Sequence, residues 1–216
     1  MSYIGKSPAA AALTASDITD GIVSNAKLAQ DIISADTELA VAPATTDELL
    51  LSDAGTLKRI DYSLITNTPA FHAFSNTNQE SISDNTWTKV TMNTELFDSD
   101  GCYDHSSNYR FTPDVAGKYY VYFNWSVYSD TADSGVVFNG SIYKNGSNVR
   151  YHATNPNSSY PEYERTSTIT SILDMNGSSD YVEAYVRLNV SSGDVTASGN
   201  ATGSLNYFGA YKLTGA

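Results

Sequence analysis

Residues able to act as nucleophile, base or metal ligand are few and scattered in this sequence. The 216 residues include three histidines and one cysteine. His72, His105 and His152 stand in no metal-ligand or triad spacing. Only "CYDH" (102–105) brings a thiol, a carboxylate and an imidazole together, in a turn-rich stretch where neighbouring extended side chains point in opposite directions. We therefore interpret it as loop or interface packing, and we expect neither an enzyme nor a cofactor.

Three carboxylates near the same turn are a weak candidate for a calcium site. Asp98, Asp100 and Asp104 flank the turn signal Asp100-Gly101. Calcium takes about six to eight oxygen ligands, commonly from a loop. No EF-hand spacing accompanies these residues, so solvated turn carboxylates are the simpler interpretation and no metal is expected.

The segment 150–167, "RYHATNPNSSYPEYERTS", is a candidate for receptor contact. It combines aromatic rings with adaptable Asn and Ser side chains. Tyrosine offers rigid contact area, and saccharides stack on its ring. The candidate contact residues are Tyr151, His152, Tyr160 and Tyr163. The alternative is a long surface loop that packs on its own strands.

Charge and hydropathy exclude several classes of partner. With 12 basic and 24 acidic residues, the formal net charge is -12. Such a chain repels nucleic-acid phosphates and anionic membranes, and only Lys58-Arg59 places two cations together. The start "MSYIGKSPAAAALTA" lacks the apolar core of a signal peptide, and no window is apolar enough for a membrane span. We expect no nucleic acid, no signal-directed secretion and no membrane insertion, and a single cysteine excludes an intrachain disulfide framework.

The chain changes composition near residue 69. Of its 16 Tyr, 7 Phe and 2 Trp, residues 1–70 hold only Tyr3 and Tyr62. This part cannot bury a large core alone: either it is disordered until it binds, or it is extended and shares apolar groups between chains. Within it, 24–33 could form a short helix, and 47–62 has the form of a small hairpin. We predict an attachment and shaft segment over 1–69 and a head domain over 70–216.

The sequence of the head domain predicts a series of β-strands. Runs rich in β-branched and aromatic residues alternate with Gly and Asn turn signals, which is typical of an antiparallel sandwich or jelly roll. In "GKYYVYFNW" (117–125), the odd-numbered residues from Tyr119 to Trp125 form an apolar face. The opposite face is aromatic as well, and later runs repeat this feature; the residues concerned are Tyr120, Tyr122, Tyr185, Tyr207 and Tyr211. Both faces of these strands therefore require cover.

The segment 98–123, "DSDGCYDHSSNYRFTPDVAGKYYVYF", resembles the signature of the C1q-like (C1q/TNF-type) globular domain. The matching residues are Asp98, Tyr103, Phe111, Thr112, Gly117, Tyr119 and Phe123. "IYKNG" (142–146) and "GSLNYFGAYKL" (203–213) resemble later strands of that family. The sequence departs from the pattern by one extra residue before Phe111, by an early Pro113 and by Val121 in place of Phe. The resemblance implies a jelly-roll head that forms a homotrimer, with the five outward tyrosines against neighbouring subunits.

The first segment resembles a different class of protein. "LTASDITDGIVSNAKLAQDIIS" (13–34) and the leader "MSYIGKSPA" resemble bacteriophage tail-fibre and other virion-fibre sequences. Together the two resemblances imply a virion structural protein, made in the host cytoplasm. Its partners would be itself, other virion proteins through residues 1–35, and a glycan or protein of the host surface. A head fibre or decoration protein with a mainly assembly role, and a bacterial C1q-like adhesin or lectin, are the alternatives.

Overall fold

The computed structural model describes residues 14, 16, 37–41, 43–44, 46–156 and 162–214. By its internal contacts the chain divides into two units, residues 1–44 and residues 45–216. The predicted helix over 24–33 lies outside the described residues, and the domain boundary at 69/70 stays a prediction. In the part of the chain that is described, no helix is long and apolar enough to cross a bilayer.

A two-stranded hairpin occupies the position where the sequence suggested one. Strands β1 (Glu48–Asp53) and β2 (Thr56–Asp61) pair antiparallel, and η3 (Tyr62–Ile65), a 3-10 turn, follows. The loop residues Ala54 and Gly55 both have positive φ, 49° and 86°, as the tight turns that suit hairpins require. Arg59 pairs with Glu48 at 2.9 Å across the strands, and leucines are exposed along the ribbon.

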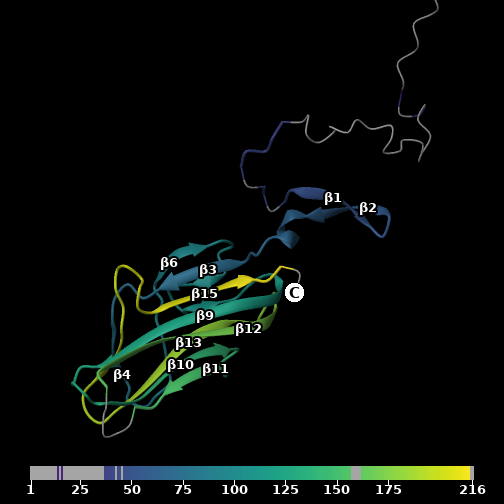
Figure 1. The fold of residues 1–216 in the computed structure, drawn as a ribbon. Helices are drawn as coiled ribbons and strands as arrows, with labels where there is room; N and C mark the ends of the chain where they lie inside the picture. The colour runs from purple at the N-terminus through teal and green to yellow at the C-terminus, as the bar shows by residue number, and fades with distance from the viewer. Residues whose placement is uncertain are drawn as a thin grey trace, which may run out of the picture. The chain divides into compact units, whose positions relative to one another are not determined.

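The remaining strands form a sandwich of two antiparallel sheets (Figure 1). Sheet I has seven strands. β12 pairs along one side of β9, and β15 and β14 pair end to end along the other; β4 then pairs with β14, β3 with β15, and β6 with β3. Its strands are β3 (Ala70–Phe74), β4 (Gln79–Ile82), β6 (Thr94–Asp98), β9 (Ala116–Ser129), β12 (Glu164–Asn176), β14 (Val195–Ala197) and β15 (Tyr207–Lys212).

Sheet II has six strands in the order β11-β10-β13-β8-β7, and β5 also pairs with β13. Its strands are β5 (Thr88–Lys89), β7 (Tyr103–Asp104), β8 (Arg110–Phe111), β10 (Gly135–Lys144), β11 (Ser147–Thr154) and β13 (Val182–Val190). All the strand pairs are antiparallel, and no α-helix occurs among the described residues. The prediction of an all-β antiparallel sandwich is confirmed.

The core lies between the two sheets and follows the two-residue period of the strands. On β9 the side chains from Tyr119 to Trp125 at odd positions are fully buried, as the sequence pattern predicted. Sheet II contributes Phe138, Ile142, Val186 and Leu188 from the opposite side. At one end Phe71 stacks between Tyr103 and Phe111, at 4.6 Å from each ring centroid.

The close approach of β10 to Trp125 gives the first testable prediction. A Cβ on Gly140 would overlap the indole of Trp125, which is completely buried. We expect Gly140→Ala to lower the free energy of unfolding by about 1–3 kcal/mol, because the ring cannot move without disturbing the core. Urea unfolding measures the change. Ser147→Ala, at the exposed start of β11, is the control, and equal stability of Gly140→Ala and the parent chain would contradict the packing described here.

Candidate functional site

The outward face of sheet I gathers four of the five predicted interface tyrosines. Since Tyr119 and Val121 point into the core, Tyr120 and Tyr122 point outward from β9. The register sets Tyr211 opposite Tyr120, and Tyr207 lies on the same face of β15. Ring centroids of Tyr120 lie 5.4 Å from Tyr211 and 6.2 Å from Tyr122, and Tyr122 lies 6.4 Å from Tyr207. The four rings form one continuous cluster.

A histidine that the sequence did not single out lies at the centre of this cluster. His72 on β3 has Nδ1 2.9 Å from the hydroxyl oxygen of Tyr122, and its ring stacks on Tyr207 at 5.5 Å. Phe97 on β6 stacks on the other side of His72 at 6.4 Å. Gly209, opposite His72, leaves room for the Tyr122 ring, which an added Cβ would overlap. The alternation around the buried Phe71 and Ala73 is the signal that could have placed His72 outward.

The ring cluster on the outward face of sheet I is aromatic and partly exposed, and charged groups lie only at its border, where Lys118 pairs with Asp174 and Arg150 lies near Tyr120. Phe97 is 49 % exposed and Ile172, opposite Tyr120 on β12, is 59 % exposed. Burial raises the pKa of Tyr122 to about 12 and lowers the pKa of His72, so both are neutral at pH 7. No carboxylate, lysine or arginine belongs to the ring cluster. A connected aromatic surface of this kind is typical of a protein–protein contact. We call the residues His72, Phe97, Tyr120, Tyr122, Tyr207 and Tyr211 the sheet I aromatic face.

Tyr185 does not join the other four tyrosines. It lies on β13 in sheet II, opposite Ser141 of β10 and Lys89 of β5. Its ring stacks on Tyr143 at 4.1 Å. The sequence correctly gave it an outward position opposite buried Val186, but the strand belongs to the other sheet. Tyr185 therefore lies apart from the other four tyrosines, and its place in a subunit interface stays a prediction.

The candidate receptor residues lie on different elements and do not form one loop. Segment 150–167 is not one long loop, because β11 extends to Thr154 and β12 starts at Glu164. Tyr151 is 62 % exposed and lies opposite Ser141, whereas His152 alternates to the other side and bonds Ser167 Oγ at 3.0 Å. Tyr163 packs near Tyr128, with ring centroids 5.5 Å apart. Tyr160 lies outside the described residues.

The acidic turn does not converge on a metal position. Asp98 accepts the backbone N–H of Tyr103 at 2.8 Å, and Asp100 accepts the Ser99 hydroxyl at 2.6 Å. Asp104 accepts the backbone N–H groups of residues 106–108, and these bonds lower its pKa. Within the described residues no group of three or more His, Cys, Asp or Glu side chains could hold a metal ion. The carboxylates shape the turn, and the calcium candidate is not supported.

The "CYDH" segment contains no nucleophile–base pair. Burial is the main reason that the pKa of Cys102 rises to about 11, so the thiol is protonated at neutral pH. His105 bonds Glu95 at 2.6 Å, and Cys102 contacts Asp114 at 3.7 Å. Asp100, Cys102 and Asp114 line an open hollow of about 400 Å³. The imidazole and the thiol have different partners, so the geometry gives no activated sulfur.

Comparison with known proteins identifies the type of fold. No protein-family model and no curated protein matches the sequence. The solved structure of Eiger TNF from S. frugiperda is similar, with a TM-score of 0.51 and 14% identity over 70% of this chain and 96% of that chain. Murine APRIL is also similar, with a TM-score of 0.47 and 11% identity over 67% of this chain and 98% of that chain. The likeness to Eiger confirms the jelly-roll fold of the C1q/TNF type.

His72 gives a prediction about pH. Burial lowers its pKa in the folded chain, while in the unfolded chain the value is about 6.5. The unfolded chain therefore binds more protons between the two values, and the free energy of unfolding falls as the pH drops below about 6.5. Urea unfolding at a fixed protein concentration, from about pH 7.5 to about pH 5, measures this slope. The slope is expected to shrink in His72→Gln and to persist in His105→Gln; equal slopes in the parent chain and His72→Gln would refute it.

Proposed function

We propose that this chain is a structural protein of a bacteriophage particle, a tail fibre or spike, that forms a homotrimer and contacts the host surface through its head. The sheet I aromatic face carries this proposal. It lies outside the core of its own subunit, and the same aromatic surface of three copies can converge around a three-fold axis.

The energetics favour association through this face. Burying one large aromatic or aliphatic side chain contributes about 1.5–3 kcal/mol. The partly exposed Phe97 and Tyr211 and the exposed Ile172 leave apolar surface available in the single chain. The neutral state of His72 and Tyr122 removes the cost of burying a charge. The number of three copies rests on the C1q-like resemblance of residues 98–123.

The hairpin supports an assembly of several chains. Leu50 is 75 % exposed and Leu57 is 70 % exposed, and an isolated two-stranded ribbon is only marginally stable. The carbonyl of Asn67 accepts the N–H of Lys212 at 3.1 Å, so the chain is fixed to sheet I two residues after η3 ends. Association of the heads would hold the hairpins at high local concentration, where their leucines can pack together.

The remaining parts of the proposal rest on the sequence. The fibre-like leader, residues 1–35, is the proposed attachment to other virion proteins. Separate partners for Cys102 and His105 support a protein that is not an enzyme. The proposed location is the virion, after synthesis in the host cytoplasm.

Replacing two tyrosines of sheet I tests the assembly. We expect Tyr120→Ser with Tyr122→Ser to convert the trimer to monomer at micromolar concentration, because each copy loses two partly buried rings from the contact. Sedimentation or light scattering gives the mass, and circular dichroism checks that the strands persist. The matched control changes two tyrosines of sheet II, Tyr143→Ser with Tyr185→Ser, and should remain trimeric. A parent chain that is monomeric, or a double variant of sheet I that stays trimeric, would overturn this interface.

An antibody against residues 70–216 tests the place of the protein on the particle. We expect it to label fibres or spikes of the intact phage in electron micrographs and to slow adsorption to the host. Antibody against an unrelated capsid protein is the control for nonspecific blocking. Particles without the protein, or labelled particles that adsorb at the normal rate, would contradict the proposed role in attachment.

A further inference from the structure

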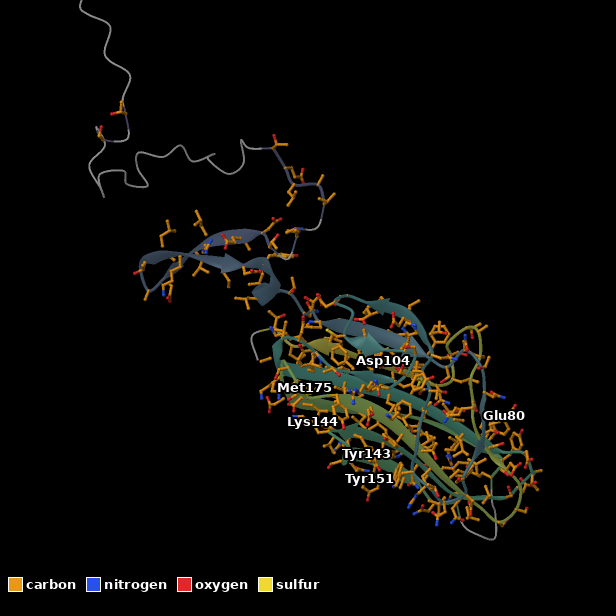
Figure 2. The ribbon with its side chains drawn as sticks, turned by 180° about the vertical axis from the view of Figure 1, so that it is seen from behind. Glu80, Asp104, Tyr143, Lys144, Tyr151 and Met175 are labelled. Carbon is orange, nitrogen blue, oxygen red and sulfur yellow. The ribbon has the colours of Figure 1, made fainter. Side chains whose placement is uncertain are left out.

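The outward face of sheet II carries a second aromatic cluster, whose chemistry differs from that of sheet I. Tyr143 of β10 and Tyr185 of β13 stack at 4.1 Å, and Trp87 lies edge-on to Tyr143 at 6.1 Å. Ser141 of β10 lies opposite Tyr185 on one side and opposite Tyr151 of β11 on the other. Tyr151 therefore extends the same face by one strand. Figure 2 labels Tyr143 and Tyr151 over β10 and β11. These rings share their face with an arginine.

Arg187 keeps its positive charge unneutralised. Its guanidinium carbon lies 5.2 Å from the centre of the Trp87 ring. With the Asn139 amide oriented to satisfy both groups, the Asn139 side-chain oxygen accepts from Nε and Nη2 of Arg187, each at 3.2 Å. Both partners are uncharged, and Arg187 takes part in none of the ion pairs found among the described residues.

Lys89 and Arg165 are neutralised, whereas Arg110 and Arg150, like Arg187, take part in none of the ion pairs found among the described residues. Lys89 pairs with the buried carboxylate of Glu183 at 2.6 Å, and Arg165 in sheet I pairs with Glu162 at 2.5 Å. Arg110 lies over the ring of Tyr181, with its guanidinium carbon 4.4 Å from the ring centre, whereas Arg187 lies beside Trp87. Asn139, only 1 % exposed, fixes one edge of the guanidinium and leaves Nη1 and the second Nη2 proton free to donate.

We propose that this face of sheet II binds an acidic saccharide. The rings of Trp87, Tyr143 and Tyr185 supply flat apolar area for the C–H face of a sugar, at little cost in side-chain entropy. The free edge of Arg187 supplies paired N–H donors for the sugar carboxylate. The inference rests on the proposed function, because it names the class of host-surface ligand that the head would contact.

The arrangement of the two sheets leaves this face available in the proposed assembly. The outward faces of sheets I and II lie on opposite sides of the sandwich, since each sheet turns its other face to the core. If the sheet I faces of three copies converge around the axis, Tyr151, Tyr185 and Arg187 are left uncovered. Three copies would present three such faces, and simultaneous attachment would strengthen weak single contacts.

A charged polymer such as nucleic acid fits this face less well than a sugar. Binding to a phosphate backbone requires several lysines or arginines along its path. Here Arg187 is the cation beside the Trp87 ring, on a protein whose overall charge repels polyanions. A single carboxylate attached to an apolar ring face matches one guanidinium beside three aromatic side chains.

Saccharide binding by the full chain tests this proposal. The probes are an array of acidic and neutral glycans, with sialyllactose against lactose and trigalacturonic acid against its methyl ester as matched pairs, followed by calorimetric titration of the acidic glycans that bind. We expect at least one acidic saccharide to bind and its neutral counterpart to bind at least about tenfold more weakly, as loss of a charged hydrogen bond implies. Arg187→Gln and Tyr185→Ser should each reduce that affinity by about tenfold or more.

Matched variants separate the outcomes. Arg165→Gln removes an arginine that is already neutralised and should bind as the parent chain does. The proposal is overturned if no acidic saccharide on the array binds, or if the neutral counterpart or a single-stranded oligonucleotide binds equally well. It is also overturned if Arg187→Gln binds the acidic saccharide with unchanged affinity. The sheet I variant Tyr120→Ser with Tyr122→Ser distinguishes the two proposals: if sheet II is the site, its monomer keeps the single-site affinity. Saccharide affinity can therefore be measured even if the chain does not form a trimer. Trimer formation can likewise be measured even if no saccharide binds.

Discussion

The two-residue alternation of β9 is the constraint on which the rest of the structure depends. This strand of 14 residues pairs with β12 along one side and with β15 and β14 along the other. Its inward residues reach Trp125 in the middle of the core, and its outward residues include Tyr120 and Tyr122. A slip of one residue would exchange the two sets and expose the indole. The core and the aromatic face of sheet I are thus two consequences of one register.

The two outward faces use similar aromatic residues but differ in charge. On sheet I, His72 and the surrounding rings are neutral, so little opposes removing them from water. On sheet II, the Tyr143–Tyr185 stack lies beside the unneutralised Arg187, whose burial against an identical copy would bring like charges together. One surface suits self-association and the other suits a small anionic partner. Aromatic content alone does not separate these roles. On sheet II the carboxylate that accepts from Tyr185, Glu183, is neutralised by Lys89, and Arg187 beside Trp87 is not neutralised.

Local features of this fold could be predicted from the sequence. The alternation from Tyr119 to Trp125 placed the core face, and the Gly and Asn turn signals indicated the antiparallel class. The hairpin position followed from Ala54-Gly55 between two apolar runs. In each case the information lies within a few neighbouring residues, where backbone geometry and side-chain period act directly.

Features that depend on strand pairing could not be predicted in this way. Tyr185 has the same local pattern as Tyr207, but only the pairing of β13 with β10 assigns it to sheet II. The contact between His72 and Tyr122 joins residues 50 positions apart. Likewise the polar segment 150–167 continues two strands, because β10 and β9 offer it partners. These positions are decided by contacts between distant segments, which a local pattern does not contain.

The position of β3 determines how the sandwich would carry a mechanical load. The chain enters sheet I at Ala70, and β3 lies between β15 and β6 instead of at an edge. Tension on the segment before Ala70 would therefore have to break two ladders of backbone hydrogen bonds before the strand could leave the sheet. An edge strand would release after one. The fold thus anchors its tether in the interior of a sheet, where force is shared between the strands on both sides.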